Sequence, residues 1–313
     1  MLALAQFFAL AVRITPSPRM ASGDASPSVM INGLPGAMGL AIAAVCERRG
    51  VRVAPFALTG PGMPSETAVG DVSVALYPPD ARDELAARVK AEYPEAGSLI
   101  CIDFTLPVAV NGNAEWYAAN GLPFVMGTTG GDREALKKTV EDAKTYCVIA
   151  PNMAKQIVAL QAALEGMAAD FPGSFAGYTL TCDESHQSSK VDTSGTAKAL
   201  SATLAALNGD GGWGDERIVR VRDVDEQRAG GGASHRGVSP VPEDALGGHA
   251  FHTYSLVSGD GLVEFQFRHN VQGRSVYAEG TVDAAVFLAR RVAAADARTS
   301  YTMIDVLRAG AMD

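Results

Sequence analysis

The feature that most constrains the fold is an alternation of short apolar runs and longer helix-like segments between residues 28 and 150. The apolar runs are SVMING, VRVAPFAL, DVSVALY, SLICIDF, PFVM and CVIAP. The intervening segments have helical spacing, as in AMGLAIAAVCERRG, DARDELAARVKAEY and DREALKKTVEDAKTY. Short buried strands that alternate with helices are typical of βαβ units and a parallel sheet covered on both faces. We therefore predict a doubly wound α/β domain over residues 28–153.

Residues 154–274 follow a different pattern. The helix-like segments are AKQIVALQAALEGMAADF and TAKALSATLAALNG, and the strand-like runs are GYTLTCDE, RIVRVRD, HAFHTYSLV and VEFQFRHN. In the last run apolar and polar side chains alternate, which predicts one buried and one polar face of a mostly antiparallel sheet. The apolar members are Val263, Phe265 and Phe267, and the polar ones are Glu264, Gln266 and Arg268. We expect an α+β domain here, after which a helix-like segment returns, so that residues 275–313 complete the first domain.

Composition and the first residues narrow the class of protein. Of the 313 residues, 47% are hydrophobic and 19% charged, and the net charge is −9. This balance argues against a nucleic-acid surface, although a locally positive pocket can still bind a small anion. Residues 1–27 hold an apolar stretch too short to span a bilayer, then two arginines, and no acid before Asp24. We interpret them as a targeting segment, with a disordered tail and initiation at Met20 as the alternative.

A glycine-rich loop follows the first predicted strand. The sequence GLPGAMG places Gly33, Gly36 and Gly39 between that strand and the first helix. Glycine at such positions permits a tight turn and close approach of the backbone to a pyrophosphate, which the helix N-terminus then binds. The spacing G-x-x-G-x-x-G departs from the usual G-x-G-x-x-G, and a purely structural turn is the alternative. The position favours dinucleotide binding, and hence a Rossmann-like domain.

Three further loops follow predicted strands of the same sheet: FTLP (104–107), GTTGG (127–131) and APNM (150–153). The carboxyl ends of parallel strands meet at one edge, where ligands bind in open α/β sheets. An NAD-selective site usually has an acid at the end of the second strand, but this chain reads ALTGPG there and has no acid before Glu66. The cofactor is therefore predicted to be NADPH, with NADH possible. The candidate cofactor-binding residues in these loops are Thr59, Phe104, Thr105, Gly127, Thr128, Thr129, Asn152 and Met153.

The segment CDESHQSSKVDTSGTAKAL, residues 182–200, concentrates the chain's chemically active side chains. His186 can deliver a proton near neutral pH, and Lys190 can hold a carboxylate. Ser194, Gly195 and Thr196 open a helix, whose backbone N–H groups can bind a carboxylate. The segment thus predicts a site for a small dicarboxylate that is protonated during the reaction.

Structural roles are the alternative for each of these residues. A lone histidine is often structural, Ser194 can be a helix N-cap, and Glu184 and Asp192 can pair with Lys190 or with backbone N–H groups. The other histidines have no comparable neighbours in the sequence. They are His235, His249, His252 and His269. No nucleophile elbow and no metal-ligand spacing occurs, so we expect no metal.

The combination of GLPGAMG, DFTLP, GTTGG, APNM, ESHQSSKVDTSGTA and GHAFH, in this order, resembles dihydrodipicolinate reductase, also called 4-hydroxy-tetrahydrodipicolinate reductase. The resemblance covers roughly residues 28–295. The segments FVMGTTGGDR and HNVQGRSVYAEGTVDAA look like the plant-type branch. This family acts in lysine formation through diaminopimelate. It transfers a hydride from NAD(P)H to an unsaturated ring, and an enzyme acid protonates the adjacent carbon.

The resemblance implies a role for each matched position. His186 would be the acid and Lys190 would hold the substrate. Gly195 and Thr196 would bind a carboxylate, and Arg274 near the domain hinge would contact the substrate. The loop at Gly127–Thr129 would position the nicotinamide. The pyrophosphate would lie against the loop from Gly33 to Met38, which includes Ala37.

One departure from the family pattern is Gln187, where bacterial members have a second histidine. It matches the plant-type form and concentrates the acid role on His186, because glutamine cannot relay a proton. The resemblance also implies a homo-oligomer, dimer or tetramer, assembled through the second domain. It favours a plastid location, with the cytoplasm as the alternative. Two other functions stay open: a reductase of another cyclic imine, and a non-catalytic NADP-binding regulator.

Overall fold

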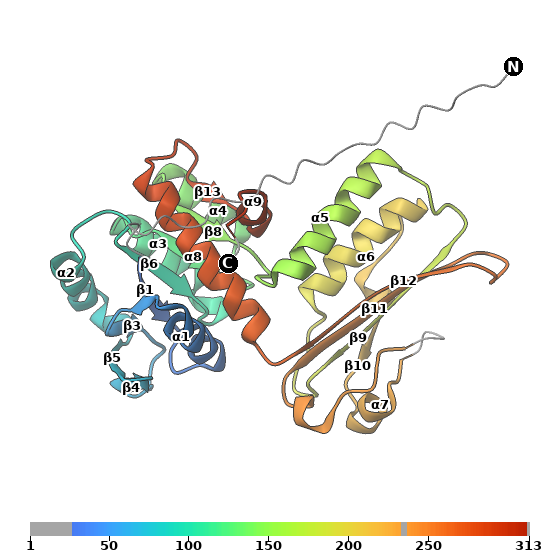
Figure 1. Cartoon of the computed structure of the whole chain (residues 1–313), viewed down its shortest axis with the longest axis horizontal. Helices are drawn as coiled ribbons and strands as arrows, with labels where there is room; N and C mark the ends of the chain where they lie inside the picture. Colours follow the sequence, from blue (N-terminus) through green and yellow to red (C-terminus); the bar gives the residue numbers. More distant parts are fainter. Residues whose placement is uncertain (1–26, 233–236, 312–313) are drawn as a thin grey trace, which may run out of the picture.

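The computed structural model describes residues 27–232 and 237–311, which form two lobes (Figure 1). The predicted targeting segment therefore lies almost entirely outside the described residues. The first lobe surrounds a six-stranded parallel sheet in the order β13-β8-β7-β6-β1-β2. Its strands are β1 (Ser28–Asn32), β2 (Arg52–Val53), β6 (Leu99–Asp103), β7 (Phe124–Met126), β8 (Cys147–Ile149) and β13 (Ser300–Tyr301).

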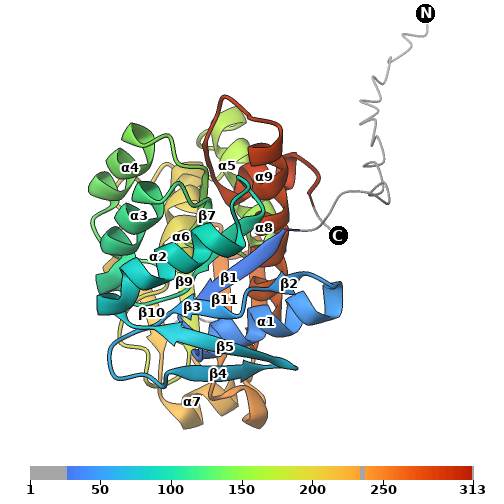
Figure 2. The same cartoon turned by 90° about the vertical axis from the view of Figure 1, so that its left-hand side faces the viewer.

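Helices cover both faces of this sheet, which confirms the doubly wound α/β prediction. Figure 2 shows α1 and α8 on one side and α3 and α4 on the other. The fully apolar centres of β1 and β6, both wholly buried, are the sequence reason for this arrangement. The helices of this lobe are α1 (Ala37–Arg49), α2 (Arg82–Glu92), α3 (Val110–Ala119), α4 (Arg133–Asp142), α8 (Ser275–Ala293) and α9 (Met303–Arg308).

The run VRVAPFAL does not form one strand, contrary to the sequence prediction. Pro55 has no N–H group to continue a ladder, and the run divides around it. β2 joins the six-stranded sheet, whereas β3 (Phe56–Leu58) joins a separate sheet in the order β3-β5-β4. The partners of β3 are β5 (Val72–Tyr77) and β4 (Glu66–Val69), and the sequence pattern did not reveal β4.

The second lobe contains a four-stranded sheet in the order β10-β9-β11-β12. β9 pairs in parallel with β10 and antiparallel with β11, which pairs antiparallel with β12, so the mostly antiparallel prediction is confirmed. Helices α5 and α6 pack together on one face of this sheet (Figure 1). The elements are α5 (Lys155–Asp170), β9 (Thr179–His186), α6 (Gly195–Asn208), β10 (Ile218–Val221), α7 (Val224–Ala229), β11 (His249–Val257) and β12 (Glu264–Gln272).

The prediction that one face of β12 is buried is wrong in part. Val263, just before the strand, and Phe265 are each 44% exposed, and only Phe267 packs partly against the hydrophobic core of the lobe. Phe265 does lie edge-on against Phe175, on the side that the alternation predicts. The physical reason is that β12 is the edge strand and the core lies mainly over β9 and β11. No helix among the described residues combines the length and apolar character needed to span a bilayer.

Candidate functional site

The glycine-rich loop lies at the carboxyl end of β1, where the parallel sheet places its ligand edge. Gly33 has a φ of +97°, and a Cβ there would lie 2.5 Å from the carbonyl oxygen of Phe104. A Cβ on Gly36 would lie 2.7 Å from the carbonyl oxygen of Gly33. Gly36 precedes α1 without a capping side chain, so the first N–H groups of the helix are available to an anion.

Two of the other predicted cofactor loops, FTLP and GTTGG, meet at the same edge around a buried carboxylate, Asp103. One carboxylate oxygen accepts hydrogen bonds from Tyr117 Oη at 2.7 Å and Asn113 Nδ2 at 2.8 Å. The other accepts from the hydroxyls of Thr105 at 2.8 Å and Thr128 at 3.2 Å. Asp103 thereby ties FTLP to GTTGG. Asp103 was not predicted as a site residue, although an acid at the end of a wholly apolar strand was a usable signal.

Some of the remaining cofactor candidates are buried and hold the loops in place, whereas others are exposed at the ligand edge. A Cβ on Gly127 would lie within 2.2 Å of the Phe104 ring, so this ring rests directly on the GTTGG loop. Thr59 is buried and its hydroxyl donates to the carbonyl of Leu34 at 2.8 Å. Met153 is buried too. The side chains of Thr59 and Met153 therefore serve to fix the loops, whereas Gly36, Ala37 and Thr129 are exposed at this edge.

A pocket of about 430 Å³ lies between the two lobes and brings most of the predicted substrate residues together. His186, Lys190 and the start of α6 line it from the second lobe, and Thr129 and Asn152 line it from the first. Asn152 Nδ2 donates to the Thr196 hydroxyl at 2.8 Å, which joins the loop after β8 to the N-terminus of α6. The full lining is Thr129, Pro151, Asn152, His186, Lys190, Asp192, Thr193, Ser194, Gly195, Thr196, Lys198 and Tyr277.

Ser194 and Arg274 are placed differently from the other predicted substrate residues. Ser194 is the N-cap of α6, because its hydroxyl accepts from the N–H of Ala197 at 3.4 Å. Arg274 precedes α8 beside Gly248 and is not among the residues that line the pocket. Tyr277, one turn further along α8, lines it instead and was not anticipated.

The surroundings of His186 favour the neutral form of its imidazole. Burial lowers the pKa of His186 to about 3, and the positive charges of Arg222 and Lys190 add to this effect. Lys190 Nζ lies 2.7 Å from Asp192, whose carboxylate is largely exposed. A dicarboxylate in this pocket would bring negative charge to Lys190 and favour the protonated imidazole.

His186 also has a histidine neighbour that sequence reasoning missed. Its Nε2 lies 3.0 Å from Nε2 of His252 on β11, 66 residues along the chain. Beside them, Glu184 pairs with Arg222 at 2.6 Å and accepts the N–H of Ser194 at 2.9 Å. Antiparallel pairing of β9 with β11 places Glu184 opposite His252 and creates the cluster.

Glu184, His186 and His252 are the one group among the described residues whose side chains could supply three metal ligands. Both carboxylate oxygens of Glu184 already have partners, and the two histidines bond each other. Arg222 and Lys190 add positive charge next to them. The donor set therefore suits a proton better than a divalent cation.

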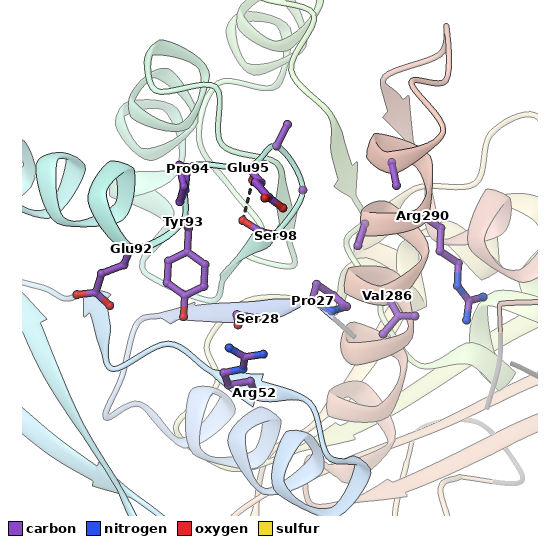
Figure 3. A pocket seen from close by; sticks show the side chains of 14 residues that line it. Pro27, Ser28, Arg52, Glu92, Tyr93, Pro94, Glu95, Ser98, Val286 and Arg290 are labelled. Carbon is purple, nitrogen blue, oxygen red and sulfur yellow. Dashed lines mark hydrogen bonds between the residues drawn. The ribbon is translucent and has the colours of Figure 1, made fainter. Parts of the chain in front are cut away.

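A cavity of about 570 Å³, larger than the pocket between the lobes, lies elsewhere (Figure 3). Its walls come from the loop after α2, the start of β1 and one side of α8. Ser28 and Ser98 place it at the amino ends of β1 and β6, at the opposite edge of the sheet from the glycine-rich loop. Volume alone therefore does not locate the site.

Comparisons with known proteins agree with this geometry. Residues 27–153 match the model "Dihydrodipicolinate reductase, N-terminus" and residues 157–307 match "Dihydrodipicolinate reductase, C-terminus". The chain is 45% identical over 285 residues to a probable chloroplastic 4-hydroxy-tetrahydrodipicolinate reductase 2 of Oryza sativa subsp. japonica, covering 91% of this chain and 84% of the relative. It is 46% identical over 286 residues to the chloroplastic 4-hydroxy-tetrahydrodipicolinate reductase 2 of Arabidopsis thaliana, covering 91% and 78%.

Among solved structures, dipicolinate-bound dihydrodipicolinate reductase from Paenisporosarcina sp. TG-14 has the same fold. The TM-score is 0.58 at 20% identity, and the match covers 88% of this chain and 97% of the other. Two family models that together span nearly all described residues, and plant relatives of about 45% identity, confirm the resemblance and its plant-type branch. This chain belongs to the dihydrodipicolinate reductase family.

Proposed function

We propose that the chain reduces 4-hydroxy-tetrahydrodipicolinate, or the dihydrodipicolinate formed from it, to tetrahydrodipicolinate in lysine biosynthesis. The observation that carries this proposal is the pocket between the lobes. In this pocket a histidine, a lysine and a helix N-terminus lie opposite the loops that follow β7 and β8. Such a pocket can bind a small dicarboxylate and hand it a proton while a hydride arrives from the cofactor side.

The cofactor would lie along the carboxyl edge of the six-stranded sheet. The uncapped N-terminus of α1 and the close approach at Gly33 and Gly36 fit a pyrophosphate. The Phe104 ring and the backbone of Gly127–Thr129 would position a nicotinamide, which supplies the hydride. β3 ends at Leu58 and is followed by Thr59 and Gly60 rather than an acid, which favours NADPH over NADH. In this proposal residues 28–153 and 275–313 bind the cofactor.

The substrate would be held mainly by residues 154–274. Lys190 would exchange its exposed partner Asp192 for a substrate carboxylate, and the N–H groups of Gly195 and Thr196 would bind the second carboxylate. Arg274 is proposed to contact the substrate from the hinge. His186 would then deliver its proton to the ring carbon next to the one that accepts the hydride.

Two features bear on where and how the protein works. We propose a plastid location, supported by the arginine- and hydroxyl-containing segment before residue 28 and by relatives named as chloroplastic.

We also propose a homodimer or homotetramer that uses the exposed edge strand β12, where Val263 and Phe265 present apolar surface. Light scattering on the wild type and Phe265→Ser tests the second point: a wild-type mass of one chain would contradict it.

The decisive experiment follows NADPH and NADH oxidation with substrate generated in situ from pyruvate and aspartate semialdehyde. Wild type should turn over, and His186→Gln should lower kcat by about 10²–10⁴-fold, the usual worth of a general acid. Equal turnover in the variant would remove His186 from the proton transfer. A folded wild type that binds NADPH but does not turn over would favour another cyclic imine, or a regulator.

A further inference from the structure

His252 lies directly behind the proton donor in the wall of the substrate pocket. Its imidazole is 1% exposed, whereas His186 lines the pocket. The two Nε2 atoms are 3.0 Å apart and the rings meet edge-on with centroids 5.2 Å apart. On its other side, Nδ1 of His252 lies 3.0 Å from the hydroxyl of Tyr254, two residues along β11. The three side chains therefore form one line from the core to the pocket.

Two ring nitrogens at this distance need one proton between them. The buried Tyr254 hydroxyl must give its own proton to an acceptor, and in the described part of the chain Nδ1 of His252 is in position to take it. A neutral His252 then carries its proton on Nε2 and donates it to Nε2 of His186. Neutral His186 consequently carries its proton on Nδ1, the nitrogen not bonded to His252.

The protonated state reverses this chain. An imidazolium at His186 has protons on both nitrogens, so its Nε2–H donates to Nε2 of His252. Neutral His252 then has its proton on Nδ1 and donates it to the Tyr254 oxygen. The groups that face the pair are Glu184, Arg222, Lys190, His249 and His269. Glu184 favours the cation, because its Oε2 is 3.8 Å from His186 Nε2 and 4.0 Å from His252 Nε2. A hydrogen bond between His186 and the backbone of His249 favours the cation too, and the two cationic side chains oppose it.

We propose that His252 is a positioning residue for the proton transfer, holding Nε2 of His186 so that Nδ1 carries the proton given to the substrate. This inference rests on the proposed function. In the step, the N–H electron pair stays on Nδ1, the proton joins the substrate carbon, and His186 is left neutral with Nε2–H still donated to His252. The hydride supplies the other hydrogen and both electrons of the reduction.

Steady-state kinetics across pH test the role. His252→Leu removes the acceptor for the imidazolium, and a charge-assisted bond is stronger than a neutral one, so the apparent pKa of kcat should fall. We expect kcat at neutral pH to drop roughly 10- to 100-fold, less than the loss of the acid itself, with KM for NADPH unchanged. His252→Gln, whose amide oxygen can accept from Nε2, should recover most of the loss.

His269→Gln is the matched control. Its ring centroid is 4.5 Å from that of His252, yet both of its ring nitrogens lack a hydrogen-bond partner among the described residues. It should keep the wild-type pH profile. Equal losses in His269→Gln and His252→Leu without a pH shift would mean a structural role only. A His252→Leu enzyme with wild-type kcat would also overturn the proposal.

Nitrogen-15 NMR of labelled histidines separates this proposal from the proposed function, since it needs no substrate. Wild-type His186 should be neutral at pH 7 with its proton on Nδ1. Tyr254→Phe deletes a single oxygen and serves if His252→Leu does not fold: it should release His252 from its tautomer and mix the two forms of His186. A proton on Nε2 of His186 in the wild type would refute the assignment even in a protein that turns over no substrate.

Discussion

Two buried carboxylates, Asp103 in the first lobe and Glu184 in the second, hold comparable places but have different partners. Each lies at or near the end of a central strand and is fully buried. Asp103 is held by neutral hydroxyl and amide donors, whereas Glu184 is held by the Arg222 guanidinium and a backbone N–H. The first arrangement fixes the shape of the cofactor edge. The second sets the electrostatic potential around His186, the proposed proton donor.

Asp103→Asn should produce the largest effect, because it places an N–H₂ group among hydrogen-bond donors. Orphaning one or more buried donors costs about 1–3 kcal/mol each, so we expect a loss of roughly 3 kcal/mol in unfolding free energy. The loops at Thr105 and Thr128 lose their common anchor, and the Kd for NADPH should rise. Urea unfolding and NADPH titration measure both. If the comparison holds, the pH profile of kcat stays as in wild type.

Glu184→Gln should instead change the pH profile. It removes the negative charge nearest the His186–His252 pair and leaves Arg222 without its counter-ion, so the pKa of His186 should fall further. We expect kcat at pH 7 to fall about tenfold, in proportion to a pKa lower by about one unit. Kinetics from pH 5 to 9 decide the point. A variant with weaker NADPH binding and an unshifted profile would mean that both carboxylates do the same work.

Acid should destabilise the second lobe more than the first, because all five histidines lie between residues 186 and 269. Burial lowers the pKa of His186, His249, His252 and His269 in the folded chain. Below the ordinary histidine pKa of about 6.5 the unfolded state binds more protons, so stability present above pH 6.5 is lost as pH falls. Each histidine that is still neutral at pH 5 in the folded chain lowers the free energy of unfolding by about 2 kcal/mol between pH 7 and pH 5.

The two tryptophans can report this loss separately, since Trp116 lies in α3 and Trp213 in the second lobe. Single-tryptophan variants unfolded in urea at pH 7 and pH 5 should show a larger drop in midpoint for the Trp213 probe. His269→Gln, which removes one contributor, should reduce that drop. Equal drops at both probes would show that the lobes unfold as one unit.

Lys190→Ala should have the smallest effect on the empty site. Its ammonium is one of the charges that lower the pKa of His186, so removing it should raise that pKa by less than about one unit. An NMR titration without substrate measures the shift. Asp192→Asn removes the partner of Lys190 and keeps the lysine charge, so no rise is expected there. A rise in both variants would place its cause in loop structure.

The sequence allowed the site to be predicted where the chemistry is local. Gly33, Gly36 and the SGT stretch are recognisable because each is adjacent to the strand end or helix start that gives it meaning. His186 and Lys190 lie four residues apart in one loop, and they do line one pocket. Strand alternation and helix spacing were likewise enough to predict a parallel sheet in the first lobe and a mostly antiparallel sheet in the second, but not the separate sheet β3-β5-β4.

Contacts across strands could not be predicted in the same way. The His186–His252 pair depends on the register of β9 against β11, and the Asp103 network on side chains from α3 and the loop after β7. The exposure of Phe265 depends on how far the core of the lobe extends toward the edge strand. Periodicity reports the direction of a side chain, but what covers that side chain is a property of the assembled fold.

The hydrogen bond between Asn152 and Thr196 crosses from one lobe to the other. A hydroxyl can accept one bond and donate another, so Thr196 can receive the Asn152 amide and still give its proton to a ligand. Through this hydrogen bond, substrate binding at Thr196 would depend on the position of the Asn152 loop, which borders the proposed cofactor site. An inhibitor that contacts both Asn152 and Thr196 would therefore bind a preorganised pair of side chains. Its affinity would fall in a conformation in which the two lobes move apart and the bond breaks.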